Sequence, residues 1–192
     1  MTKLSLFGTI HSSNESKTKI KKILEQHKFD ALLTEGVQTK SSGWYRKEPF
    51  LIIPARLYFG WLDNLGSEFT IVDKIAKDNN IDNVNMDKSL DELVNYFHKP
   101  YYNVIFLIVI IAMIATSSNL FLIIVSFIVA EIVYSAIFAY KFINLRDNFF
   151  HEKINDVDNS EKYTNVLIIC GNEHVKGIMK IFPNVEDLTN TF

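Results

Sequence analysis

A long apolar stretch constrains this chain more than any other feature of its sequence. Between residues 101 and 140 the only charged side chain is Glu131, and the apolar run is interrupted only at residues 117–119. A helix needs about 20 mostly apolar residues to cross a bilayer. The stretch therefore predicts two transmembrane helices joined by a tight turn. The alternative is a helical hairpin buried in a soluble protein, but such helices normally carry polar positions where they meet water, and residues 104–116 contain nothing more polar than Thr116.

The rest of the chain has the composition of an ordinary soluble domain. Residues 1–100 and 141–192 hold all 20 Lys and Arg and, because Glu131 is the one acidic residue of the hairpin, 21 of the 22 Asp and Glu. We expect these two segments to form one soluble α/β domain. Their nearly balanced charge argues against nucleic acid as a partner. The single cysteine, Cys170, excludes an internal disulfide and a cysteine-based zinc site.

The charges that flank the apolar stretch predict its orientation. Lys99 precedes the first predicted span, Lys141 and Arg146 follow the second, and the connecting turn carries no charge. Positively charged flanks are retained on the cytoplasmic side of membranes. The sequence therefore predicts a multi-pass protein of the cell membrane whose soluble domain faces the cytoplasm, with the lipid bilayer as one partner. Glu131, alone in the apolar stretch, suggests self-association through the hairpin as a further contact.

Short apolar runs alternate with helical patterns in the soluble part. Helices are predicted over Glu15–Lys28 and Gly66–Asn79 and from Ser89 onward. The expected strands are Leu4–Phe7, Ala31–Thr34, Asn83–Met86 and Asn165–Cys170. Such alternation is typical of a mostly parallel sheet with flanking helices.

A residue able to bind metal or move protons follows each expected strand. These residues are His11, Glu35, Asp87 and His174. The carboxyl ends of parallel strands lie along one edge of the sheet, where ligands bind, so we expect the four side chains to share one crevice. His11 and His174 each stand three residues after a glycine, and two imidazoles with carboxylates form a site for zinc, manganese or iron. The alternative is that both histidines only cap helices or bond within the fold.

The order of these elements resembles the TraB/PrgY-like family, which is related in its motifs to the Tiki metalloproteases. The matching elements in this chain are Gly8-Thr-Ile-His11, the strand ending at Glu35, Gly66-Ser-Glu68, Met86-Asp87-Lys88, the helix start Arg146-Asp147, and Gly171-Asn-Glu-His174-Val-Lys-Gly177-Ile178. The apolar hairpin departs from the family pattern, because it stands between the Asp87 and Arg146 elements.

The resemblance implies a TraB/Tiki-like fold with an inserted transmembrane hairpin, and a metal-dependent hydrolase that acts on a peptide or protein. In that reading His11 and His174 bind a divalent ion (Mn, Zn, Co or Fe), and Glu35 is either a ligand or the general base. Supporting or substrate-orienting roles would fall to Gly8, Glu68, Asp87, Arg146, Asp147 and Gly171, although Arg146 is equally well explained as a structural ion pair. The alternative function is a non-enzymatic membrane protein that binds or sequesters a peptide signal.

Overall fold

The computed structural model describes residues 2–10, 13–35, 67–89, 92, 100–116 and 119–191. The chain divides into two compact units. One comprises Met1–Thr39, Asn64–Lys88 and Ile143–Phe192, and the other comprises Lys40–Asp63 and Ser89–Phe142.

The first unit is built on a five-stranded sheet in which every pair of neighbouring strands is parallel. The spatial order is β3-β2-β4-β1-β5. The strands are β1 (Lys3–Thr9), β2 (Ala31–Thr34), β3 (Asp82–Asn85), β4 (Asn165–Gly171) and β5 (Glu186–Asp187). The predicted parallel sheet with flanking helices is confirmed. The fifth strand was not predicted, because its two residues are both acidic and carry no apolar pattern.

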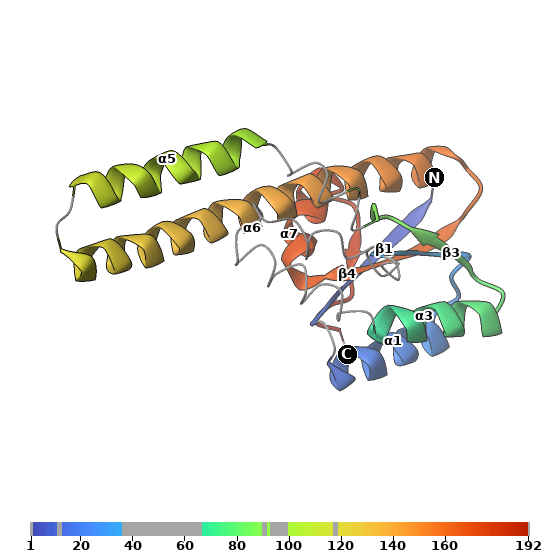
Figure 1. Cartoon of the computed structure of the whole chain (residues 1–192). Helices are drawn as coiled ribbons and strands as arrows, with labels where there is room; N and C mark the ends of the chain where they lie inside the picture. The colour runs from blue at the N-terminus through green and yellow to red at the C-terminus, as the bar shows by residue number, and fades with distance from the viewer. Residues whose placement is uncertain are drawn as a thin grey trace. The chain divides into compact units, whose positions relative to one another are not determined.

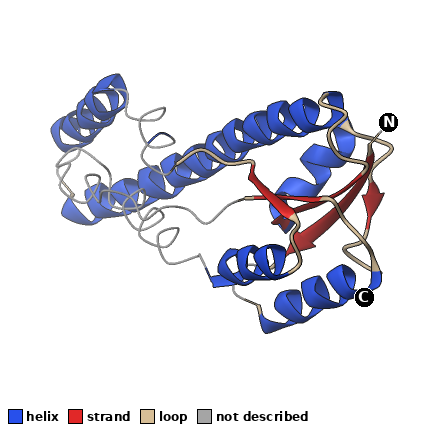
Figure 2. Cartoon of the chain, turned by 90° about the vertical axis from the view of Figure 1, so that its right-hand side faces the viewer, coloured by secondary structure: helices blue, strands red, loops and turns tan. Residues whose placement is uncertain are grey.

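Helices cover both faces of this sheet (Figures 1 and 2). On one face, α1 (Asn14–Gln26) and α3 (Ser67–Asp78) place Ile20, Ile23, Val72 and Ala76 in a core with β-strand side chains such as Leu167. The other face is covered by α7 (Asn172–Ile181) and by the last part of α6, a helix that spans Leu120–Asn159.

The strand order explains how two helical layers arise. From β1 the chain moves past the position of β4 to β2 and then to β3, and it later returns to place β4 between β2 and β1. Crossovers between parallel strands are right-handed, so the reversal of direction sends the later helices to the opposite face. Phe150 and Ile154 of α6 and Ile178 of α7 fill the core there. A ligand-binding crevice of an open α/β sheet lies where strand order reverses, which here is the carboxyl end of β4.

The second unit contains α5 (Pro100–Thr116) and the first part of α6, which Figure 1 shows as two antiparallel helices. Most of the large apolar side chains described there are exposed, by 38 % to 71 % from Leu107 to Ile132, while Met113 and Ile123 are partly buried. Within the described part of the chain, no helix combines the length and the apolar character required to cross a membrane.

The structure corrects the predicted helix start at Arg146. Arg146 and Asp147 were expected at the start of a helix, but they lie well inside α6, which begins at Leu120. The residues between Tyr140 and Arg146 contain neither Gly nor Pro, so the backbone has no local reason to leave the helical conformation.

Candidate functional site

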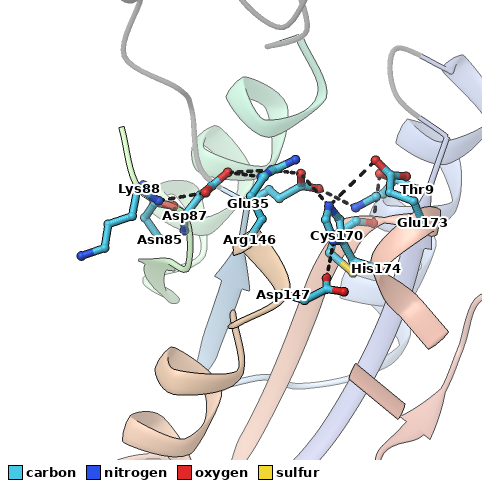
Figure 3. A network of polar contacts seen from close by, with 11 residues as sticks. Thr9, Glu35, Asn85, Asp87, Lys88, Arg146, Asp147, Cys170, Glu173 and His174 are labelled. Atoms are coloured by element: carbon cyan, nitrogen blue, oxygen red, sulfur yellow. Dashed lines mark hydrogen bonds and ion pairs between the residues drawn. The ribbon is translucent and has the colours of Figure 1, made fainter. Parts of the chain in front are cut away.

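Polar side chains gather at the carboxyl edge of the sheet, within the first unit (Figure 3). Glu35 follows β2, Asp87 stands two residues beyond β3, and Gly171 is the last residue of β4. Two further elements reach the same place, because α6 brings Arg146 and its neighbour Asp147, and the first turn of α7 brings His174. Most of the residues expected at one crevice are therefore close together.

Arg146 holds two carboxylates that come from different strands. Its Nη2 donates to Glu35 Oε1, and it also donates to Asp87 Oδ2 across 2.6 Å. Its Nε donates to the same Asp87 oxygen across 3.0 Å. The side chains of Arg146, Glu35 and Asp87 are 3 %, 4 % and 1 % exposed. The three ionisable groups are thus almost completely removed from water, and Arg146 is the partner of both carboxyl groups.

Burial and charge act in opposite directions on these groups. Burial raises the pKa of Asp87, and the Arg146 guanidinium, which lowers that pKa, only partly offsets the effect. Burial lowers the pKa of Arg146, but the Glu35 and Asp87 carboxylates raise it more, so its pKa lies above the ordinary value. Arg146 is therefore a permanent cation that joins β2 and β3 to α6.

Glu35 also joins two strands of the sheet. Its Oε2 accepts a hydrogen bond from the backbone N–H of Gly171 at 2.5 Å, while its Oε1 accepts from Arg146. Both carboxylate oxygens are thus held by donors that belong to β4 and α6. Hydrogen bonds to a charged acceptor are about twice as strong as neutral ones, so this pair of contacts fixes the position of Glu35 at the end of β2.

His174 is the most distinctive group of the site. Its side chain is 0 % exposed, and its Nδ1 lies 2.5 Å from Asp147 Oδ1. A carboxylate only accepts hydrogen bonds, so Nδ1 carries a proton, and in a neutral imidazole Nε2 would then be an acceptor. The edge of the imidazole packs against Phe150, with ring centroids 4.9 Å apart. Nε2 is buried and has no hydrogen-bond partner in the described part of the chain.

Two carboxylates face this unsatisfied nitrogen. Glu35 Oε1 lies 3.9 Å from Nε2, and Glu173 Oε1 lies 4.0 Å from it. Neither distance is a hydrogen bond. A buried acceptor without a partner lowers the stability of the fold by about 1–3 kcal/mol. A bound cation or a proton between the imidazole and the two carboxylates would remove this cost.

The glycine of the His-x-x-Gly motif has a role in this geometry. A Cβ placed on Gly177 would lie 2.7 Å from Asp147 Oδ2. Only a residue without a side chain lets the Asp147 carboxylate approach α7 closely enough to reach His174. The spacing in the motif thus reflects the packing of α6 against α7.

The remaining predicted site residues fall into two groups. Gly8 lies close to the start of α7. A Cβ added to Gly8 would lie 2.6 Å from Val175 Cγ2 and 2.9 Å from Asn172 Oδ1. Glu68 belongs to α3, and its side chain is outside the described part of the structure. His11 also lies outside the described residues.

Among the residues that are described, no group of three or more His, Cys, Asp and Glu side chains is arranged to hold a metal ion.

Sequence reasoning missed the contribution of Glu173 and the pairing of Asp147 with His174. An acidic residue in the first turn of a helix normally indicates only a favourable interaction with the helix dipole. The partner of His174 is 27 residues away on another helix, and no local pattern identifies it.

The single cysteine of the chain adds no chemistry to the site. Burial raises the pKa of Cys170 well above its ordinary value, and the nearby Glu35 and Glu173 carboxylates raise it further. A thiol in that state is a poor nucleophile. The candidate chemistry therefore rests on His174 and its carboxylate neighbours.

Comparison of the chain with known protein families, curated proteins and solved structures gave no match.

Proposed function

We propose that this protein is a membrane-anchored, metal-dependent hydrolase of the TraB type that acts on a peptide or protein. The observation that carries the proposal is the state of His174, whose Nδ1 is bound by Asp147 and whose buried Nε2 has no partner. Histidines that bind metals characteristically donate their other ring N–H to a carboxylate, which fixes the tautomer and the ring orientation. The resemblance in motif order points to the same residue.

The buried, unpartnered Nε2 of His174 is what supports a divalent ion at this edge. His174 Nε2 would bind it together with a carboxylate and with His11, which follows β1. Ile10 and Ser13, on either side of that segment, are joined by a hydrogen bond from Ser13 N to Ile10 O at 3.1 Å. A site that contains histidine nitrogen and carboxylate oxygen is suited to zinc, manganese, iron or cobalt.

The chain's own residues would prepare the site in two ways. Asp147 would hold the imidazole of His174 so that its Nε2 lone pair points between Glu35 and Glu173. Glu35 and Arg146 would keep the ends of β2 and β4 together, so that the ligands keep their spacing. When bound, a divalent ion would supply a water molecule with a lowered pKa and would polarise the scissile carbonyl.

The metal content of the purified protein tests this proposal. We expect the purified wild-type protein to bind about one ion per chain after incubation with Mn²⁺ or Zn²⁺, and His174→Ala and His11→Ala to lose it. The matched control is His27→Ala, because His27 lies at the exposed end of α1. A wild-type protein that binds neither ion would refute the proposal.

One observation favours the alternative function, a membrane protein that binds or sequesters a peptide signal. Glu35, Arg146 and Asp87 form a buried group of ion pairs, which is also what a purely structural network looks like. The two functions differ in the fate of a bound peptide. Capture of peptides by the metal-free protein without any cleavage on addition of Mn²⁺ or Zn²⁺ would favour sequestration.

Membrane anchoring is supported by the exposed apolar side chains of the second unit. Leu107, Ile108 and Ile111 on α5 and Phe121 and Ile132 on α6 are each more than half exposed. Exposed apolar area of this extent marks a surface that contacts lipid or another protein.

Topology can be tested with one added cysteine. Lys99 and Lys141 flank the apolar stretch, so we expect residues 117–119 outside the cell and the soluble domain in the cytoplasm. In Ser118→Cys, the new thiol should react with an impermeant reagent in intact cells. The native Cys170 is buried, and the wild-type protein serves as the control for its reaction. Labelling of Ser118→Cys only after cell lysis would contradict this topology.

A further inference from the structure

We infer that Glu173, and not Glu35, supplies the carboxylate that binds the metal ion beside His174. The inference rests on the proposed function and assigns a ligand within that site. Sequence patterns favoured Glu35 because it follows a strand, whereas Glu173 was only the residue before His174. The structure distinguishes the two carboxylates by the buried bonds that hold Glu35 and by the greater exposure of Glu173.

Distance alone does not separate the two candidates. Their nearest oxygens lie 3.9 Å and 4.0 Å from His174 Nε2. Two ligands that are each about 2.1 Å from a tetrahedral ion lie about 3.4 Å apart. Both carboxylates are therefore within about 0.6 Å of the spacing expected for ligands of one ion.

The partners of Glu35 leave it poorly suited to bind a cation. Its Oε1 accepts from Arg146 and its Oε2 accepts from the N–H of Gly171. The Arg146 guanidinium neutralises its charge, and would also repel a divalent ion placed beside it. Binding through Glu35 would require the loss of at least one of these buried hydrogen bonds.

Glu173 differs from Glu35 in its exposure and in its place on α7. Its side chain is 40 % exposed, so an ion and a substrate can approach it from solvent. Its carboxylate is folded back over the end of β4, because a Cβ on Gly171 would lie 2.6–2.7 Å from the Glu173 carboxyl atoms. Figure 3 shows this carboxylate and the His174 ring on the same side of the site.

The position of Glu173 also addresses an electrostatic difficulty. The site lies at the amino end of α7, whose backbone dipole disfavours a cation. A carboxylate in the first turn, next to the ligand nitrogen, offsets that field directly. The Glu173 carboxylate therefore places negative charge next to the ligand nitrogen, 4.0 Å from His174 Nε2.

The test measures metal binding to the full chain in detergent micelles. Calorimetric titration with Mn²⁺ gives the affinity, and the visible absorption of bound Co²⁺ reports the type and number of ligands. The proteins compared are the wild type, Glu173→Gln, Glu35→Gln and the control Glu152→Gln, whose side chain is exposed on α6. Changes in groups that only support ligands cost about 10–100-fold in affinity, so we expect Glu173→Gln to lose about 100-fold or more and to change the Co²⁺ spectrum.

The other variants separate a ligand from a structural residue. We expect Glu35→Gln to lower the melting temperature while its folded form keeps the wild-type Co²⁺ spectrum. We expect Gly171→Ala to displace the Glu173 carboxylate and to weaken Mn²⁺ binding even though Glu173 is intact. Wild-type metal binding that Glu173→Gln retains would overturn the inference and leave the proposed function standing. A wild-type protein without metal affinity would instead refute the proposed function.

Discussion

Removal of the Arg146 guanidinium is the most direct test of how the site is held together. Arg146→Met keeps an apolar side chain of similar length but leaves the Glu35 and Asp87 carboxylates buried without their cation. The lost contacts include two hydrogen bonds to Asp87 and one to Glu35, from side chains that are each less than 5 % exposed. Removal of one partner from a buried ion pair costs about 3–5 kcal/mol, a large share of the usual total stability of about 5–15 kcal/mol.

The loss should also depend on pH, with a sign fixed by Asp87. Burial raises the folded-state pKa of Asp87 above its unfolded value. Such a carboxyl group stabilises the fold below its unfolded pKa, and this contribution is lost as the pH rises through the folded pKa. Without the guanidinium the folded pKa rises further, so the protonated form persists to higher pH. The destabilisation caused by Arg146→Met should therefore be smaller at pH 5 than at pH 8.

Cys170 provides the assay. It is the single cysteine, it is fully buried at the end of β4, and its thiol becomes reactive only when the sheet opens. Thiol labelling across a urea series reports unfolding of the sheet unit separately from the hairpin. The control is Lys77→Met, which removes an exposed ion pair with Asp73 on α3 and should cost less than about 0.5 kcal/mol. A loss below about 1 kcal/mol in Arg146→Met, or one that does not change with pH, would refute the reasoning.

Three further changes test other parts of the structure. Gly177→Ala places a Cβ 2.7 Å from Asp147 Oδ2, so it should destabilise the sheet unit by about 1–3 kcal/mol in the same labelling assay; wild-type stability would show that the packing of α6 on α7 is looser than described. Asp147→Asn should weaken Mn²⁺ binding about 10–100-fold, measured by calorimetry, because the partner that orients His174 is altered; unchanged affinity would contradict that role. Glu131→Leu should reduce crosslinked oligomers in native membranes, and an undiminished yield would exclude Glu131 as the contact that drives self-association.

The sheet was predictable because its strands are coded locally. Ala31–Thr34 is a continuous apolar run bounded by polar residues, and the observed β2 has the same limits. The predicted Asn165–Cys170 differs from β4 by one residue. Strands covered on both faces leave such runs in the sequence. The two-residue β5 pairs with β1 through its backbone alone and leaves no pattern to recognise.

The site was only partly predictable, for a physical reason. Glu35, Asp87 and His174 could be placed together because parallel strands share a carboxyl edge. Each of these three side chains has a hydrogen-bond partner on α6. The sequence does not show which charged residues of that helix face the ends of the strands. Arg146 reaches Glu35 across a separation of 111 residues, and nothing near Glu35 in the described chain indicates that partner.

The position of β4 in the sheet has a consequence for how the protein is made. β1 and β2 do not pair with each other, because both pair with β4, whose residues follow them by more than 130 positions. A nascent chain that ends before Asn165 therefore contains three strands but not the one that joins β1 to β2. Contacts between residues so distant in sequence form slowly, and the apolar hairpin emerges from the ribosome before they can form. We expect β1 to remain unprotected from proteolysis in ribosome-bound chains until β4 (Asn165–Gly171) has been synthesised. A strand made near the end of the chain thus decides when the first strand can fold.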